Sequence, residues 1–423
     1  MYCYSVEIME VHFSAFRPSF VILLAILTTT GTTSSCPNGC SCTGGAPATS
    51  LTVDCQRNAN ISREQLSKQL DSLLSSNLTY GRLRSLRIIN TPLTHVPRSV
   101  CRLTTLTQLH LDFNRLTRLP DNCLTNLTAL TSLTASYNSI TELQDGLFDA
   151  LDKLVTLTLD HNSISSIGLR VFNSSAMLTS LMNVDLQFNR IQTLEPWPYY
   201  VGLNGHLGNV AIINLDVNNI STFTNMMGWK AHCDMRVPYL KLVLDRNPMK
   251  HVTDILRGWN ISLTISLCLQ RLRTPHRSFT ISLFRTYLEC DCIDFFMYKY
   301  VHSSILKTSF LSNAYCNKPD TLYGKRIDVV PLDQFACELT ERCPPGCRCV
   351  HRPANATLHV YCSNTNLTVF PLELPELPKS YTKYKLDFSN NRQLRRLEHR
   401  DYLVNTSILD VSNCNLDSID FEM

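Results

Sequence analysis

One apolar pattern recurs along the chain and limits its fold more than any other feature. The template L-x-x-L-x-L-x-x-N-x-L-x-x-L fits seven segments, which start at Leu83, Leu106, Leu130, Leu154, Leu181, Val210 and Tyr239. The starts lie 23, 24, 24, 27, 29 and 29 residues apart. A unit of this length cannot bury its apolar side alone, so neighbouring units must stack. The sequence therefore predicts a curved solenoid over residues 83 to 260.

Each unit contains the signature of a short strand. In the unit that starts at Leu106, Leu109 and Leu111 alternate with polar residues, which is the period of a strand with one buried face. Stacked units would align these strands in a parallel sheet. We expect strands centred near residues 85–88, 108–111, 132–135, 156–159, 183–186, 212–215 and 241–244.

A polar residue recurs where each strand ends and the backbone must turn inward. It is Thr91 in the first unit, and then Asn114, Asn138, Asn162, Asn189, Asn218 and Asn247. An Asn side chain carries donors and acceptors, so it can satisfy buried turn groups of its own coil and of the adjacent coil. We expect these asparagines and the repeated leucines to hold the solenoid together and not to contact a ligand.

The amino terminus and the cysteines indicate secretion. Residues 1–35 contain the apolar run from Phe20 to Leu27 followed by small residues, which is typical of a signal peptide cleaved near residues 31–35. The 18 cysteines then belong to the oxidising pathway, where disulfides are favoured over metal sites. Nine N-x-S/T sequons predict a glycosylated extracellular protein, at Asn60, Asn77, Asn126, Asn173, Asn219, Asn260, Asn355, Asn366 and Asn405.

Three cysteine clusters flank the repeats, with the spacings C-x3-C-x-C-x12-C from Cys36, C-x-C-x23-C-x20-C from Cys290, and C-x3-C-x-C-x12-C from Cys343. They resemble the amino- and carboxy-flanking caps of extracellular leucine-rich-repeat proteins. The resemblance implies an α/β solenoid, a horseshoe with short parallel strands on its concave face and disulfide-bonded caps. It also implies crossed bonds, which pair Cys36 with Cys42, Cys40 with Cys55, Cys290 with Cys316, Cys292 with Cys337, Cys343 with Cys349, and Cys347 with Cys362. The aromatic residue that the family commonly has as Trp after Cys-x-Cys is Phe295 or Phe296 here.

The remaining cysteines are assigned from parity and position. Cys101 with Cys123, and Cys233 with Cys268, are candidate pairs, while Cys414 stands where a second array would have its Asn. The family also allows Cys there, which predicts a buried unpaired thiol. That second array follows the third cluster and begins with Leu386 and Leu409 as strand residues.

The predicted order of modules is a signal peptide at 1–35, an amino cap at 36–82, repeats at 83–288, a carboxy cap at 289–338, a second amino cap at 339–382 and an incomplete second array at 383–423. This order resembles the ectodomain of multi-cysteine Toll-type receptors. Slit-like secreted guidance or adhesion proteins share the alternation and are the alternative. Because no second carboxy cap precedes Met423, we expect a fragment or an incomplete gene model.

The Toll resemblance implies innate-immune or developmental signalling through a protein ligand, for which a cystine-knot cytokine is a candidate, and it allows a receptor dimer. A membrane segment would lie outside this chain. The formal charge of +4, from 39 basic and 35 acidic residues, is too balanced for a nucleic-acid footprint. The chain has no G-x-S-x-G, H-E-x-x-H or phosphate-loop pattern, so we expect no enzyme, cofactor or metal site.

Two surfaces are candidates for ligand binding. Aligned repeats place acidic and polar residues in one column and aromatic residues in the next, which would suit a basic, partly apolar partner. The alternative is that residues of these types are simply common at these positions in the family and do not mark a binding surface. The first column is Ile89, Asp112, Ser136, Asp160, Gln187, Asp216 and Asp245, and the second is Asn90, Phe113, Tyr137, His161, Phe188, Val217 and Arg246.

The second candidate is formed by insertions in the longer repeats. Trp197 and Trp229 stand there among other aromatic and apolar residues. Aromatic anchors often carry interface energy. Alternatively, these side chains cover the core behind the coil. We expect a protein ligand to bind the concave face, or its flank, near the fourth to seventh repeats.

Overall fold

The computed structural model describes residues 36–43, 50–55, 63–74, 83–168, 170–172, 178, 180–195, 197, 211–224, 240–251, 253–254, 279–295, 298–299, 314–377 and 383–420. Expectations for the signal peptide, Trp229, Phe296, Cys233, Cys268 and the sequons at Asn60, Asn77, Asn173 and Asn260 lie outside these residues.

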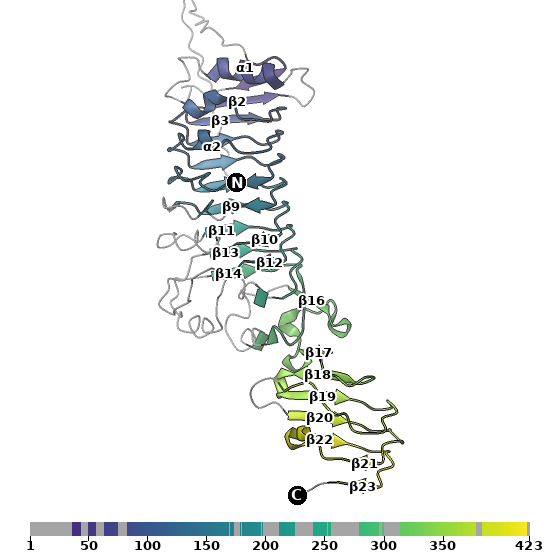
Figure 1. Ribbon diagram of the computed structural model, residues 1–423. Helices are drawn as coiled ribbons and strands as arrows, with labels where there is room; N and C mark the ends of the chain where they lie inside the picture. Colours follow the sequence, from purple (N-terminus) through teal and green to yellow (C-terminus); the bar gives the residue numbers. More distant parts are fainter. Residues whose placement is uncertain are drawn as a thin grey trace, which may run out of the picture. The chain divides into compact units, whose positions relative to one another are not determined.

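Short strands stack side by side in one sheet along the first array (Figure 1). The hairpin of β1 and β2 is antiparallel, and every later pairing in this sheet is parallel. The strands in order are β1 (Cys40–Thr43), β2 (Ser50–Cys55), β3 (Ser85–Ile89), β4 (Gln108–His110), β5 (Ser132–Thr134), β7 (Thr156–Thr158), β9 (Asn183–Asp185), β11 (Ala211–Asn214), β13 (Leu240–Val243) and β14 (Phe279–Ser282). All seven predicted strands are confirmed.

The core is a column of apolar side chains from consecutive strands. Strand register places them side by side, and each is at most 1% exposed: Leu86, Leu109, Leu133, Leu157, Val184, Ile213, Leu242 and Ile281. Burial of apolar surface on this scale drives stacking, since each coil covers the apolar side of the next.

The recurrent asparagines join the coils as predicted. Asn138 donates from Nδ2 to the carbonyl oxygens of Leu111 at 2.9 Å and Ala135 at 3.1 Å, while its Oδ1 accepts from the Leu116 backbone N–H at 3.0 Å. The same three-way contact recurs at Asn162, Asn189, Asn218 and Asn247. Each amide therefore satisfies turn groups of two adjacent coils.

The first array contains one coil more than the seven that the template fits, within the region predicted for the repeats at 83–288. The strand β14 adds an eighth coil beyond residue 260, and Thr286 takes the place of the Asn, with its hydroxyl donating to the Leu244 carbonyl oxygen at 3.5 Å. The irregular spacing before this coil hid it from the template. Thr286 also mirrors Thr91 at the opposite end of the array, so both end coils replace the amide by a hydroxyl.

The back of the first array has little helix among the described residues. Helices are α1 (Arg63–Leu74) in the amino cap and the single turn α2 (Asp121–Leu124), with the 3-10 turn η1 (Arg98–Arg102) between them. Further along, short parallel pairs replace helix: β6 (Glu142–Leu143) with β8 (Ser166–Ile167), and β10 (Thr193–Leu194) with β12 (Thr222–Phe223).

A second amino-cap hairpin and sheet follow the carboxy cap. The cap contains β15 (Tyr287–Glu289), β16 (Tyr315–Lys318), η3 (Asp320–Leu322), η4 (Ile327–Val329) and η5 (Leu332–Gln334). The second sheet, in order, is β17 (Cys337–Leu339), β18 (Arg348–Arg352), β19 (Thr357–Tyr361), β20 (Lys383–Asp387) and β22 (Thr406–Asp410), with η6 (Pro353–Asn355), η7 (Asp401–Asn405) and the pair β21 (Arg396–Leu397) and β23 (Ser418–Ile419) beside it. The strands β19, β20 and β22 pair in parallel, as the strands of the first array do.

The caps carry the crossed disulfides that the family resemblance implies. The bonds are Cys36–Cys42, Cys290–Cys316, Cys292–Cys337, Cys343–Cys349 and Cys347–Cys362, and Cys101–Cys123 also forms. Cys40 is disulfide-bonded and lies directly opposite Cys55 in the β1–β2 register. Cys414 is unpaired as predicted, but it is only partly buried, with its thiol 3.2 Å from the Phe388 carbonyl oxygen.

Candidate ligand-binding surface

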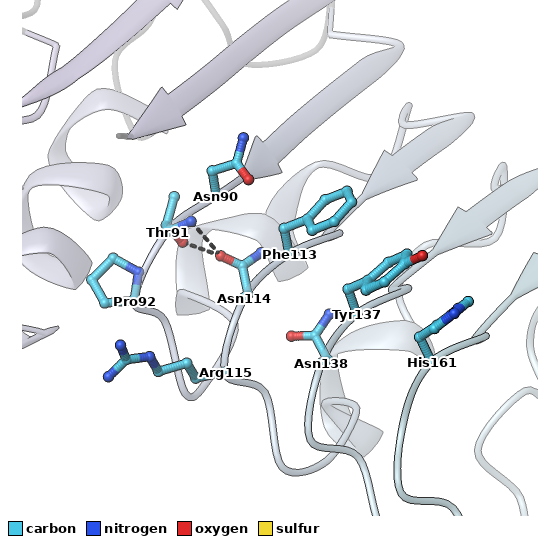
Figure 2. Close-up of a pocket in the computed structure, with 9 residues that line it drawn as sticks. All are labelled: Asn90, Thr91, Pro92, Phe113, Asn114, Arg115, Tyr137, Asn138 and His161. Atoms are coloured by element: carbon cyan, nitrogen blue, oxygen red, sulfur yellow. Dashed lines mark hydrogen bonds between the residues drawn. The ribbon is translucent and has the colours of Figure 1, made fainter. Parts of the chain in front are cut away.

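Four ring side chains stack in a row along one edge of the first sheet. Phe113 lies on Tyr137 with centroids 4.5 Å apart, Tyr137 on His161 at 4.1 Å, and His161 on Phe188 at 4.3 Å. Interplanar angles of 10°, 12° and 20° make all three contacts face to face. Figure 2 shows the first three rings side by side, each from its own coil. We call Phe113, Tyr137, His161 and Phe188 the ring ladder.

Backbone conformation produces this alignment. Every residue of the predicted second column has a positive φ, with values of 55° at Asn90, 58° at Phe113, 55° at Tyr137, 53° at His161, 53° at Phe188, 50° at Val217 and 52° at Arg246. The left-handed region is unfavourable for residues with a Cβ, and the recurrent turn before each Asn imposes it here. Repetition of one backbone geometry then points each side chain in the same direction, one strand spacing apart.

The ring ladder lies at the surface. Phe113 is 40% exposed, Tyr137 45% and Phe188 37%, although each touches at least one neighbouring ring. Around its first rings an open groove of about 460 Å³ is lined by Asn90, Thr91, Pro92, Phe113, Asn114, Arg115, Tyr137, Asn138 and His161. A contiguous exposed apolar strip bordered by polar groups is typical of an interaction surface.

The neighbouring acidic column is turned into the fold. Asp160 is 8% exposed, and its carboxylate accepts from the Ser136 hydroxyl and contacts His161 Nδ1 at 2.7 Å. Asp112 accepts from the Ser136 backbone N–H at 2.8 Å and the Thr134 hydroxyl at 2.7 Å. These carboxylates therefore link successive coils before any partner arrives.

The last two carboxylates of the column are engaged in the same way. Asp216, 8% exposed, accepts from Arg246 Nε at 2.8 Å and from its Nη2. Asp245 accepts from the Ser282 hydroxyl and the Phe284 backbone N–H, both at 2.7 Å. Burial raises the pKa of Asp245, and these hydrogen bonds oppose the rise. Arg246 also reaches over Phe188, with Cζ 5.8 Å from the ring centroid, and closes that end of the ring ladder.

Trp197 belongs to the core and not to an exposed anchor. It is 1% exposed and packs on Phe172 with ring centroids 4.4 Å apart, while Phe172 stacks on Phe148 at 5.7 Å. The exposed position that the sequence suggested for Trp197 is wrong, and the alternative of a side chain covering the core behind the coil is right.

A charged cluster joins the seventh coil to the carboxy cap. His251 Nδ1 lies 3.6 Å from the Asp294 carboxylate and 3.8 Å from that of Asp291, and its Nε2 lies 3.9 Å from Glu289. Asp294 raises the pKa of His251, burial opposes the rise, and Asp291 adds to it. Although His251, Glu289 and Asp291 could converge on a cation, opposite charge explains their proximity without one.

The described sequons are accessible. Asn126, Asn219, Asn355, Asn366 and Asn405 are all exposed. Asn219 directly follows the buried Asn218 in the chain. Among the described helices, none is both long and apolar enough to cross a membrane.

Comparisons with known proteins agree with this architecture. The leucine rich repeat model matches residues 81–140 and 128–191, and the leucine rich repeat N-terminal domain model matches residues 342–375. A search of curated proteins finds no match.

Solved structures with the same fold include two from the Toll–Spatzle complex of Drosophila. One is 23% identical with a TM-score of 0.55, and covers 81% of this chain and 47% of that chain. The glycosylated form is 23% identical with a TM-score of 0.52, and covers 80% and 49%. The chain thus spans about half the length of each. Together, the stacked coils, the cap disulfides and the matched models show a leucine-rich-repeat fold, which is similar to the fold of the Toll structures.

Proposed function

We propose that the chain is the ligand-binding ectodomain of a Toll-like receptor in innate-immune or developmental signalling, and that it binds a protein ligand along the ring ladder. The observation that carries the proposal is a row of four stacked, surface rings on a fold whose other repeated side chains are buried or bonded inward. Aromatic side chains at a surface are the residues that most often dominate protein interfaces.

The rigidity of the strip supports binding. Stacked rings on a sheet edge have little rotamer freedom left to lose, so a partner that contacts them pays a small ordering cost. The ladder begins in the second repeat and ends under Arg246 in the seventh, which overlaps the region predicted from sequence. No catalytic role is part of this proposal.

The partner we propose is a cystine-knot cytokine, because the Toll structures of similar fold are complexes with Spatzle. The test is surface plasmon resonance between the full secreted chain and a Spatzle-type cytokine. Double replacement of Tyr137 and Phe188 by Ala should weaken binding at least about tenfold, since removing interface anchors costs about 2 kcal/mol or more.

A matched control is available in the carboxy cap. Tyr323 is 65% exposed and lies outside the ladder, so Tyr323→Ala should leave binding unchanged. Unaltered affinity of the folded Tyr137→Ala/Phe188→Ala protein, or equal loss in the control, would count against the ring ladder as the contact surface.

A secreted Slit-like guidance or adhesion protein remains the second candidate, because alternating arrays and caps are common to both classes. The full-length transcript separates them. A hydrophobic helix and an intracellular signalling domain encoded downstream of Met423 establish the receptor. A continuing series of repeat arrays without such a helix establishes the secreted protein. Receptor dimerisation belongs to the first proposal and is tested by sedimentation with and without cytokine.

A further inference from the structure

We infer that the ring ladder and its flanking arginines receive an acidic, apolar segment of the partner protein. The inference rests on the proposed function, because it specifies the chemistry of the same contact. It reverses the polarity expected from the acidic column in the sequence. Three observations carry it: which part of each ring is open, which charges flank the rings, and where the carboxylates point.

The rings present their edges to the partner. Tyr137 is stacked on both faces, by Phe113 and by His161, yet remains 45% exposed. Its open surface is therefore the ring rim and the hydroxyl. An aromatic rim carries partial positive charge, while the negative charge lies on the faces. A row of rims attracts oxygen atoms and apolar groups of a partner more than it attracts cations.

Two exposed arginines, Arg115 and Arg190, each stand two residues after a ring of the ladder, Phe113 and Phe188. Arg115 lines the same groove as Phe113 and Tyr137, and its side chain lies on the side of Pro92 (Figure 2). Arg190 occupies the equivalent position three coils later, since both backbone N–H groups donate to the coil before, to Leu93 and Ile164. Neither guanidinium has a carboxylate within ion-pair distance among the described residues.

The exposed face of the strands beside the ring ladder also carries positive charge. Arg87 on β3 and Lys241 on β13 are exposed there. The acid on this face, Asp185, is half-buried, and burial raises its pKa while the Gln187 backbone N–H donates to it at 3.1 Å. Other described positions on the face include Thr134, Thr158, His110 and the exposed Ile212.

The carboxylates that could attract a basic partner are already occupied. Asp160 and Asp216 have side chains only 11% and 12% exposed. Each accepts a hydrogen bond from a neighbouring coil, Asp160 from the Ser136 hydroxyl and Asp216 from Arg246. A partner thus meets unpaired guanidinium groups and ring rims, and not free carboxylates. Charge complementarity at such a surface favours acidic residues interspersed with aliphatic or Met side chains, whose sulfur also packs well against ring edges.

The test uses two fluorescent nonapeptides with the full chain, measured by fluorescence polarisation at low salt. In one peptide Asp and Glu alternate with Leu and Met, and in the other Lys replaces every acid. We expect the acidic peptide to bind at least about tenfold more tightly, and added salt to reduce the difference. Equal binding of the two peptides, or preference for the Lys peptide, overturns the inference.

Substitutions test whether the preference for the acidic peptide arises at this edge of the sheet. Arg115→Glu with Arg190→Glu should abolish or invert it, whereas Arg118→Glu, an exposed arginine in the same coil as Arg115, should preserve it. Tyr137→Ala should weaken binding of the acidic peptide severalfold. If Arg118→Glu has the same effect as the double variant, the inference fails, because the preference then reflects net charge. Failure of the cytokine to bind, with the peptide preference intact, rejects the receptor proposal and leaves the inference standing.

Discussion

The ring of Tyr137 lies 4.1 Å from that of His161, centroid to centroid, and their planes are 12° from parallel. His161 in turn contacts the Asp160 carboxylate through Nδ1 at 2.7 Å. The exposed rings and the buried acids are therefore parts of one lattice, in which the first column fastens adjacent coils and the second column faces outward. Substitutions in the two columns should have different effects, on stability in the first and on binding in the second.

The column of positive φ values predicts a stabilising substitution. Val217 has φ 50°, and a β-branched side chain in the left-handed region is unfavourable. Val217→Asn should raise the free energy of unfolding by about 1 kcal/mol, because Asn tolerates this conformation. Val217→Ile, which keeps the branch, should give no gain. Thermal unfolding of the three proteins provides the comparison, and a loss in the Asn variant would show that strain is not the governing factor.

The asparagine contacts predict a large loss of stability. Asn162 is 8% exposed, donates to Ala135 and Leu159, and accepts from the Ile140 backbone N–H. Asn162→Ala should lower the free energy of unfolding by about 2 kcal/mol or more, since buried backbone groups lose their partners. Denaturant titration measures the effect. Asn183→Ala, at an exposed strand position, is the matched control and should change little.

Burial of Trp197 gives a prediction that separates core from interface. Trp197→Ala should lower the free energy of unfolding by about 3 to 5 kcal/mol, because a large buried side chain leaves a cavity against Phe172. Ligand affinity of the fraction that remains folded should match that of the unaltered protein. If the Trp197→Ala protein stays stable but no longer binds the ligand, Trp197 belongs to the interface and not to the core.

The cluster around His251 predicts a pH dependence of stability. Asp294 and Asp291 raise the pKa of His251 in the folded protein above the usual 6.5, despite opposition from burial. Protonated His251 therefore stabilises the fold. That contribution is complete below pH 6.5 and is lost as pH rises through the higher folded pKa.

The measurement is the denaturant midpoint between about pH 6 and pH 9, the range in which a histidine with a raised pKa titrates. Stability should fall with rising pH in the unaltered protein, and His251→Gln should flatten this dependence. His95→Gln, at an exposed position on the first array, is the control. An unchanged slope in the His251 variant would mean that another group governs the effect.

Periodicity was enough to locate seven strands and the asparagine contacts, because each repeated residue meets the same neighbours in every coil. The eighth coil escaped because its spacing is irregular and Thr286 replaces Asn. Trp197 was ambiguous for a different reason: an insertion has no repeating neighbours, so its sequence does not specify which side faces the core.

The sequence by itself determined the solenoid and which residues align in columns, since both follow from a local period and from apolar burial. It also placed Asp160 and Asp216 beside the rings. Only the tertiary structure decided that these acids turn inward while the rings stack with their edges outward. A carboxylate finds its hydrogen-bond donors on the next coil, as Asp216 does on Arg246, and a ring finds its stacking partner there too. The character of the exposed edge is therefore set between coils and is not encoded in any single one.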